Sequence, residues 1–280
     1  MTEPLRGIRA ITLDFGNTLV PVGRAALDRV VDVTARAICG RWPDLERNAF
    51  LSAWNEERDR QFREEVPNFR EVDLGERLVR VFARLRAGRS APAGDEAWDQ
   101  VWAAAWSDPA DIAWAVAAYS EAFVAGIPAP PGVSELLQRL ARDRDVAILS
   151  NWPLAATIDR YAEVNGWLPS LRAIVVSERV GTIKPHPAIF AAARRALGEP
   201  APRSILHVGD DWAADVVGAR DVGWRTAWLR VRPPDTPLPT SRRDATFEPD
   251  LVMDSVNELP IHLAACHEDD PPALETIPLE

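Results

Sequence analysis

The chain has 280 residues, of which 47% are hydrophobic and 26% are charged, and this composition suits one large folded domain or two smaller ones. Its formal net charge of -10 argues against nucleic acid and anionic membrane surfaces as partners, because both are bound by basic surfaces. The two cysteines, Cys39 and Cys266, form neither a disulfide framework nor a metal-ligand spacing. No signal-peptide pattern opens the sequence, and no apolar run approaches the ~20 residues of a spanning helix. We therefore expect a cytoplasmic protein, either a monomer or a homodimer.

Six short apolar runs predict buried parallel strands, because they are apolar throughout rather than alternating with polar residues. They cover residues 10–13, 146–149, 173–176, 205–208, 226–229 and 251–253. Helical patterns occupy residues 133–142, 187–197 and 213–221. Strand and helix alternate from about residue 130 onward, which predicts βαβ units and a parallel sheet.

The segment 22–128 follows the first predicted strand and has helical periodicity with no convincing strand of its own. An insertion of this length between two core strands predicts a helical cap rather than a loop. We therefore expect an α/β core formed by residues 1–21 and 129–264 and a helical cap formed by residues 22–128. The proline-rich segment 128–132 is the expected hinge, residues 232–240 are an expected surface loop, and residues 265–280 are an expected disordered tail.

Two features of this helical segment allow more than one interpretation. Trp98, Trp102 and Trp106 recur at four-residue spacing, which is typical of a packed helix face but also fits a stacking platform for an aromatic substrate. Arginines and glutamates are interspersed between residues 56 and 70. This pattern predicts a solvated helix face, or the contact of one arginine with a substrate carboxylate or phosphate.

Polar residues follow four of the predicted strands, where ligands bind in open parallel sheets. They are Asp14, Ser150 with Asn151, Lys184, and Asp210 with Asp211. Each has an ordinary explanation by itself, as a helix cap or a solvated charge. Four such positions on successive strands instead predict one site at the edge of the sheet.

The chemistry of these side chains is coherent. Asp14 can attack phosphorus as a nucleophile and, with Asp210, can bind a hard cation such as Mg²⁺ through oxygen. Ser150 and Lys184 can hold the oxygens of the transferred group. Asp215 can orient Lys184 or a metal-bound water.

Four motifs, in order, resemble those of the haloacid dehalogenase superfamily. The first motif lies at residues 14–19 (DFGNTL), the second at 149–151 (LSN) and the third at 181–185 (GTIKP). The fourth lies at 207–211 (HVGDD) and is followed by Asp215. The resemblance covers about residues 8–20 and 130–232, which is nearly the whole predicted core. It implies an α/β fold with a Rossmann-like three-layer parallel-sheet core and an α-helical cap domain.

The resemblance also implies roles for individual residues. Catalytic roles fall to Asp14, Thr18, Ser150, Asn151, Lys184 and Asp215. Mg²⁺ would be held by Asp14, Asp210 and the backbone carbonyl of Gly16, with Asp211 in support. The substrate would be a small, phosphorylated molecule.

Gly16 departs from the family pattern, because phosphatases of this family usually carry a proton-donating Asp at that position. General acid catalysis is typically worth ~10²–10⁴-fold in rate, so alkyl phosphate esters are expected to be poor substrates. Acyl phosphates depend less on protonation of their leaving group. Four other residues could supply the proton: Asp59, Glu64, Asp73 and His186.

Three functions remain open at the level of sequence. The first is a magnesium-dependent phosphatase or phosphotransferase that acts on a small phosphorylated metabolite, which the acidic pair at 210–211 favours. The second is a metal-free 2-haloacid dehalogenase-like hydrolase; in that group the position of Gly16 is usually aromatic, that of Asp210 uncharged and that of Phe190 tends to be Tyr. The third is a non-enzymatic binding or regulatory protein, which Gly16 suggests. A signalling receiver domain fits less well, because its acidic pair lies early in the chain and no large insertion follows its first strand.

Overall fold

The computed structural model describes residues 5–87, 92, 96–244 and 246–264. Its centre is a six-stranded sheet in the order β3-β2-β1-β4-β5-β6, in which every neighbouring pair is parallel. The strands are β1 (Ala10–Leu13), β2 (Asp145–Ser150), β3 (Ala173–Val176), β4 (Ile205–Gly209), β5 (Arg225–Leu229) and β6 (Leu251–Met253). All six predicted strands are present, with ends that differ by one residue at most. This order is that of a Rossmann-like sheet, in which the direction of winding reverses between β1 and β4.

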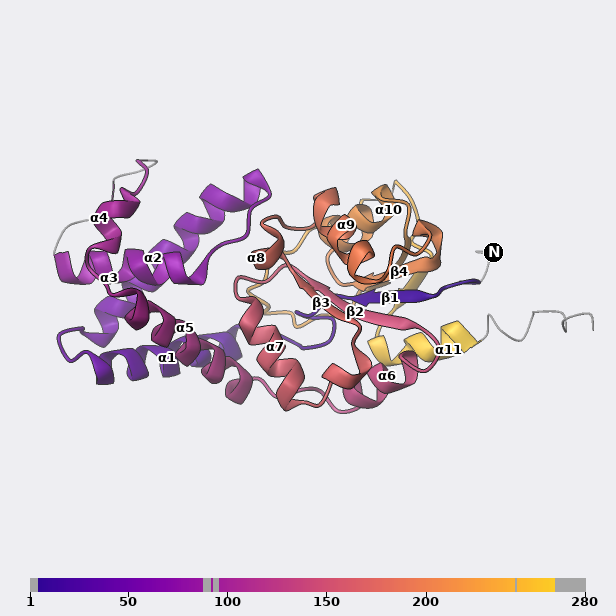
Figure 1. The fold of residues 1–280 in the computed structure, drawn as a ribbon, viewed down its shortest axis with the longest axis horizontal. Coiled ribbons are helices and arrows are strands. Elements are labelled where there is room, and N and C mark those ends of the chain that lie inside the picture. Colours follow the sequence, from indigo (N-terminus) through magenta and orange to yellow (C-terminus); the bar gives the residue numbers. More distant parts are fainter. Residues whose placement is uncertain (1–4, 88–91, 93–95, 245, 265–280) are drawn as a thin grey trace, which may run out of the picture.

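Helices cover both faces of the sheet, which confirms the α/β architecture. Figure 1 shows α6 (Val133–Leu140), α7 (Ala155–Val164) and α11 (Leu259–Ala264) on one face, and α9 (Pro187–Ala196) and α10 (Gly218–Asp221) on the other. The short helix α8 (Ser177–Val180) follows β3, and 3₁₀ turns occupy Val66–Asn68, Leu168–Ser170, Pro202–Ser204 and Val256–Glu258.

Alternate residues of β1 and β2 belong to two separate hydrophobic cores. Ile11 and Ile148 belong to the core shared with α6 and α7, whereas Ala10 and Leu149 belong to the core shared with α9 and α10. This is the two-residue period of a strand that is buried on both sides. These strands are apolar throughout because both of their faces are buried.

One predicted helix has a different form. The segment expected to be helical over 213–221 is a π-helix at Trp212–Val217 followed by α10. Asp211 caps the π-helix by accepting a hydrogen bond from the backbone N–H of Ala214. The side chain of Asp215 turns back and accepts from the backbone N–H of Asp211 at 2.9 Å, so the wider turn aims Asp215 at the sheet edge. π-turns of this kind are frequent at functional sites.

A helical insertion separates β1 from β2. It contains α1 (Arg24–Arg41), α2 (Arg47–Glu65), α3 (Leu74–Ala87), α4 (Gln100–Ala104) and α5 (Pro109–Gly126). The described residues between 22 and 128 contain no strand. In Figure 1 these helices form a body beside the sheet, with α1 packed along α5 and α2 along α3.

The tryptophan row and the arginine and glutamate run of the insertion have defined surroundings in the structure. Only Trp102 lies within α4, yet the three rings pack in a row, with Trp98 stacked on Trp102 at 6.2 Å and Trp102 against Trp106 at 5.9 Å. The arginine and glutamate face of α2 is partly internal, because Glu57 and Arg60 are buried. It is therefore not the uniformly solvated face that the pattern predicts.

None of the helices described is long and apolar enough to cross a membrane. The predicted loop at 232–240 is irregular and packs over the turn that follows β1. The expected disordered tail and Cys266 lie outside the described residues.

Candidate active site

The polar residues that follow β1 to β4 converge at the carboxyl edge of the sheet, where the winding reverses. Asp14 follows β1, Ser150 ends β2, Lys184 lies in the loop after α8, and Asp210 follows β4. All four are buried, although they carry charged or polar groups. Buried polar groups are held by specific partners, so their contacts define the site.

Lys184 is the centre of this network. Its Nζ donates to Asp14 Oδ1 at 2.8 Å, to Asp215 Oδ1 at 2.5 Å and to the backbone carbonyl of Leu149 at 2.9 Å. Burial lowers the pKa of Lys184, but the attraction of the two carboxylates outweighs this effect and raises it above its ordinary value. The ammonium group is therefore charged at neutral pH and fixed in position.

His207, on β4, secures Asp215 from behind. Its Nε2 lies 3.1 Å from Asp215 Oδ1 and its Nδ1 lies 2.8 Å from the hydroxyl of Thr12. Burial lowers the pKa of His207, so the imidazole is neutral. Since a carboxylate only accepts, Nε2 carries the proton and Nδ1 accepts from Thr12. Burial raises the pKa of Asp215, but Lys184 and His207 outweigh it and hold the pKa below its ordinary value.

Asp210 is a buried carboxylate whose partners in the described part of the chain are all weak. Its Oδ2 lies 3.5 Å from Asn17 Nδ2 and 3.4 Å from an Arg232 nitrogen. Burial, with repulsion from Asp215 and Asp14, raises the pKa of Asp210 to about 8. Oxygens of Asp14, Asp210 and Asp215 lie within 4.8 Å of one another, so three acidic groups are crowded at one point.

Asp14 is the most accessible member of this acidic group. Its Oδ1 accepts from Ser150 at 3.0 Å and from Lys184, whereas Oδ2 accepts no hydrogen bond from the described part of the chain. Burial raises the pKa of Asp14 to about 6, opposed by Lys184. Oδ2 is thus left available for a cation or for attack on a substrate.

Three other residues expected at the site have distinct placements. Asn151 exchanges two hydrogen bonds with the backbone of Lys184, at 3.0 and 2.7 Å, so it positions that residue. Asp211 caps the π-helix and accepts from the backbone and hydroxyl of Ser241. Thr18, four residues after Asp14, is buried, but its hydroxyl has no hydrogen-bond partner among the described residues.

Gly16 lies against a side chain that occupies the space beyond its Cα. A Cβ added at Gly16 would lie 2.7 Å from Leu238 Cδ1 and 3.3 Å from Trp152 Cζ3. Leu238 belongs to the loop that packs over the turn. The loop therefore fills the place where an acidic side chain would project.

A cavity of about 910 Å³ opens above Asp14 and extends into the helical insertion. Of the four residues proposed as proton donors, only Asp59 lines it. His186 instead caps α9 by accepting from the backbone N–H of Ala188. The cavity wall also contains residues that the sequence analysis did not single out: Glu71, Arg77 and Tyr119.

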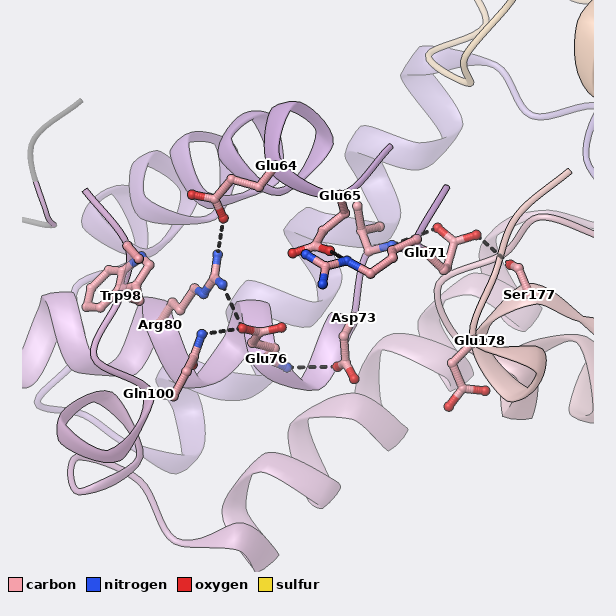
Figure 2. Close-up of a pocket in the computed structure, with 14 residues that line it drawn as sticks. Glu64, Glu65, Glu71, Asp73, Glu76, Arg80, Trp98, Gln100, Ser177 and Glu178 are labelled. Carbon is pink, nitrogen blue, oxygen red and sulfur yellow. Dashed lines mark hydrogen bonds and ion pairs between the residues drawn. The ribbon is translucent and has the colours of Figure 1, made fainter. Parts of the chain in front are cut away.

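A second cavity, of about 580 Å³, shares Glu71 and Val72 with the first and includes Glu64 and Asp73 (Figure 2). Most of its acidic residues are already engaged within the protein. Arg80 pairs with Glu64 and Glu76, and Glu71 accepts from the hydroxyl of Ser177 at 2.5 Å. Among the described residues, none that lines this acidic cavity forms a hydrogen bond or ion pair with Asp14.

Comparison with known proteins defines the class. A buried carboxylate, a buried lysine and further acidic residues lie together at the edge of a Rossmann-like sheet. A family model for haloacid dehalogenase-like hydrolases matches residues 8–223, and the chain belongs to this family.

Curated relatives match only parts of the chain. The pyrimidine 5'-nucleotidase YjjG of Escherichia coli (strain K12) is 31% identical over 107 residues, which cover 38% of this chain and 47% of the nucleotidase. The glyceraldehyde 3-phosphate phosphatase of Pyrococcus abyssi (strain GE5 / Orsay) is 37% identical over 57 residues, which cover 20% of this chain and 24% of that protein. The chain thus spans less than half the length of these relatives.

Solved structures resemble the whole chain at low identity. The putative HAD-hydrolase YfnB from Bacillus subtilis, bound to magnesium, has a TM-score of 0.59 and 18% identity, covering 92% of this chain and 99% of that one. The 2-haloacid dehalogenase from Pseudomonas syringae pv. Tomato DC3000 has a TM-score of 0.62 and 20% identity, with the same coverage. At such identity these likenesses establish the fold alone.

Proposed function

We propose that this hydrolase is a magnesium-dependent phosphatase or phosphotransferase that acts on a small phosphorylated metabolite through an aspartyl-phosphate at Asp14. One observation carries the proposal: among the described residues Asp210 is a buried carboxylate with only weak partners, and it lies close to Asp14, whose Oδ2 accepts no hydrogen bond from them. Segments 1–21 and 129–264 would act as the catalytic core, and segment 22–128 as the cap that excludes water from it.

The donor set fits a magnesium ion. Mg²⁺ prefers hard oxygen ligands, and Asp14, Asp210 and the backbone carbonyl of Gly16 would supply them. Asp215 is less suited to direct ligation, because both of its oxygens already accept from Lys184, His207 and the backbone of Asp211. A bound Mg²⁺ would neutralise the crowded carboxylates and the anionic substrate.

The side chains of the protein carry out the other steps of the proposed reaction. Asp14 Oδ2 attacks phosphorus, and the bond from phosphorus to the leaving oxygen breaks as the bond to Asp14 forms. Lys184 and Ser150 stabilise negative charge on the transferred phosphoryl oxygens. Water then attacks the aspartyl-phosphate and releases inorganic phosphate, or another acceptor takes the group.

Leaving-group preference follows from Gly16 and Leu238. No acidic side chain stands at position 16, and Leu238 fills the neighbouring space. Acyl and aryl phosphates leave without full protonation, so we expect them to be better substrates than alkyl phosphates.

Attack on a carbon–halogen bond is the competing reaction. Phe190 has no hydroxyl group and packs against His207 and Trp224 rather than in the wall of the cavity. The carboxyl oxygens of Asp210 also suit a hard cation rather than a halide at this edge of the sheet.

The test is phosphate release from acyl, aryl and alkyl phosphates with and without Mg²⁺, using wild type, Asp14→Asn and Asp28→Asn. Asp28 lines the same cavity from α1 but is exposed, so its variant is the matched control. We expect turnover that requires Mg²⁺, is abolished in Asp14→Asn and persists in Asp28→Asn. Metal-independent chloride release from 2-chloropropionate, with no phosphate release, would contradict the proposal.

A further inference from the structure

The insertion contributes a polar recess to the wall of the large cavity, formed by Arg77 of α3, Tyr119 of α5 and Trp54 of α2. The guanidinium carbon of Arg77 lies 5.1 Å from the centre of the Trp54 ring. Tyr119 stacks on the same indole at 5.8 Å between ring centres. The three side chains are therefore packed as one unit.

Arg77 is fixed on one side and open on the other. Its Nε donates to Gln61 Oε1 at 2.9 Å, and Gln61 in turn donates to the carbonyl of Asp73. Within the described part of the chain, its two terminal nitrogens have no hydrogen-bond or ion-pair partner, although the residue is only 5% exposed. The hydroxyl of the buried Tyr119 likewise has no hydrogen-bond partner among the described residues.

An uncompensated buried charge is costly, so such groups normally carry a partner. Burial lowers the pKa of Arg77 to about 10, with Tyr119 opposing the shift and Arg58 adding to it. Arg77 is still charged at neutral pH. Arg58 lines the same wall but is paired with Asp59 at 2.8 Å, so the terminal nitrogens of Arg77 are the cationic donors that an anion would stabilise.

We propose that Arg77 and Tyr119 bind a second anionic group of the substrate, a carboxylate or phosphate, at the insertion end of the cavity. This inference rests on the proposed function, since it assigns the substrate class of the same site. The planar guanidinium fork matches the paired oxygens of such groups, and the phenol adds a further donor. A cavity of about 910 Å³ accommodates a molecule with anions at both ends.

The two ends of the cavity offer different groups, which gives the substrate a direction. The core end holds the crowded carboxylates that would take a metal and a phosphoryl group. The insertion end offers the terminal nitrogens of Arg77 and the hydroxyl of Tyr119, which have no hydrogen-bond partner among the described residues. A substrate with one anionic end is held only at the core, whereas a substrate with two is held at both.

The test measures binding rather than turnover, using a homologous series of phosphonocarboxylates and alkylphosphonates of matched length, with Mg²⁺ present, by titration calorimetry. A bisphosphonate series distinguishes a phosphate from a carboxylate at the far end. We expect the best phosphonocarboxylate or bisphosphonate to bind the wild-type protein more than ~10-fold tighter than its alkylphosphonate, as a charge-assisted bidentate pair provides.

Three variants test which residues cause the preference for a second anion. Arg77→Gln should abolish the preference for a second anion, and Tyr119→Phe, which keeps the ring packing, should reduce it. Arg24→Gln is the control, because Arg24 lines the same cavity but is exposed, and it should keep the preference. Circular dichroism of each variant establishes that it is folded.

The outcomes separate the two proposals. If alkylphosphonates bind but a second anion adds nothing in wild type, the subsite is refuted and the phosphatase proposal stands. The subsite is also refuted if the preference persists in folded Arg77→Gln or is lost in Arg24→Gln. If no phosphonate binds at all, both proposals fail. Should Arg77→Gln not fold, the comparison of probes in wild type and Tyr119→Phe decides the matter.

Discussion

The clearest test of the chemistry is to restore an acidic side chain at Gly16. In Gly16→Asp, the new Cβ would lie 2.7 Å from Leu238 Cδ1, about 1 Å closer than carbon atoms normally approach. The clash involves the free end of a flexible side chain, so Leu238 can move aside. Adding Leu238→Ala removes the obstacle and leaves room for the carboxyl group.

The double variant Gly16→Asp/Leu238→Ala should gain general acid catalysis. We expect kcat/KM for alkyl phosphates to rise by ~10²–10⁴-fold over Leu238→Ala, a barrier reduction of about 3–5 kcal/mol. Aryl phosphates should change little, because their leaving groups need less protonation. The assay is phosphate release from one alkyl and one aryl ester under the same conditions.

The matched control is Gly16→Asn/Leu238→Ala, which has nearly the same shape but cannot donate a proton as an acid. Equal rates for the Asp and Asn double variants on alkyl esters would refute the reasoning about Gly16. A gain of equal size for alkyl and aryl esters would refute it too, because the benefit would then come from a change in binding rather than from proton transfer.

Three further predictions concern the stability of the site. Lys184→Met should lose ~3–5 kcal/mol in urea unfolding, because Asp215 would be left buried without its cation; a loss below 1 kcal/mol (about the value of a surface pair) would contradict this. Gly218→Ala should lose ~1–3 kcal/mol, since its Cβ would meet the Phe190 ring at 2.8 Å, and an unchanged melting temperature would refute it. Burial raises the pKa of Glu71 from 4.5 to about 7, so ionisation of the unfolded chain disfavours the fold as the pH rises through this range. The stability of Glu71→Gln relative to wild type should therefore rise between pH 4.5 and about 7, on the order of 2–3 kcal/mol, and then level off; a difference independent of pH would count against it.

The sequence was sufficient to predict the core and the residues at its edge. Buried parallel strands read as short apolar runs, and the carboxyl ends of such strands meet at one edge. Asp14, Ser150, Lys184 and Asp210 could therefore be brought together without coordinates. The π-helix at 212–217 was not predictable, because its hydrophobic period over so few residues resembles that of an α-helix.

The parts of the cavity formed by long-range packing could not be predicted. Nothing local in the sequence places Leu238 over Gly16, since the loop that carries it is more than 200 residues away along the chain. Arg77 lies among many arginines of the insertion, most of which pair with acids. Only the packing of α2, α3 and α5 places Arg77 in the cavity wall with terminal nitrogens that have no partner among the described residues.

The connector between α2 and α3 links the two ends of the cavity. The carbonyl of Phe69 accepts from Thr182 and from the backbone of Ile183, next to Lys184. Glu71 accepts from Ser177, whose hydroxyl also accepts from the backbone of Trp152.

Because Trp152 lies against Gly16 and Ile183 precedes Lys184, the packing of the insertion against the core and the placement of Lys184 share the same contacts. A substrate that binds the insertion through Arg77 would therefore favour the arrangement that also holds Lys184 in place. Contacts at the insertion end should thus influence kcat as well as KM, as expected when binding energy from a remote group is used at the reacting centre.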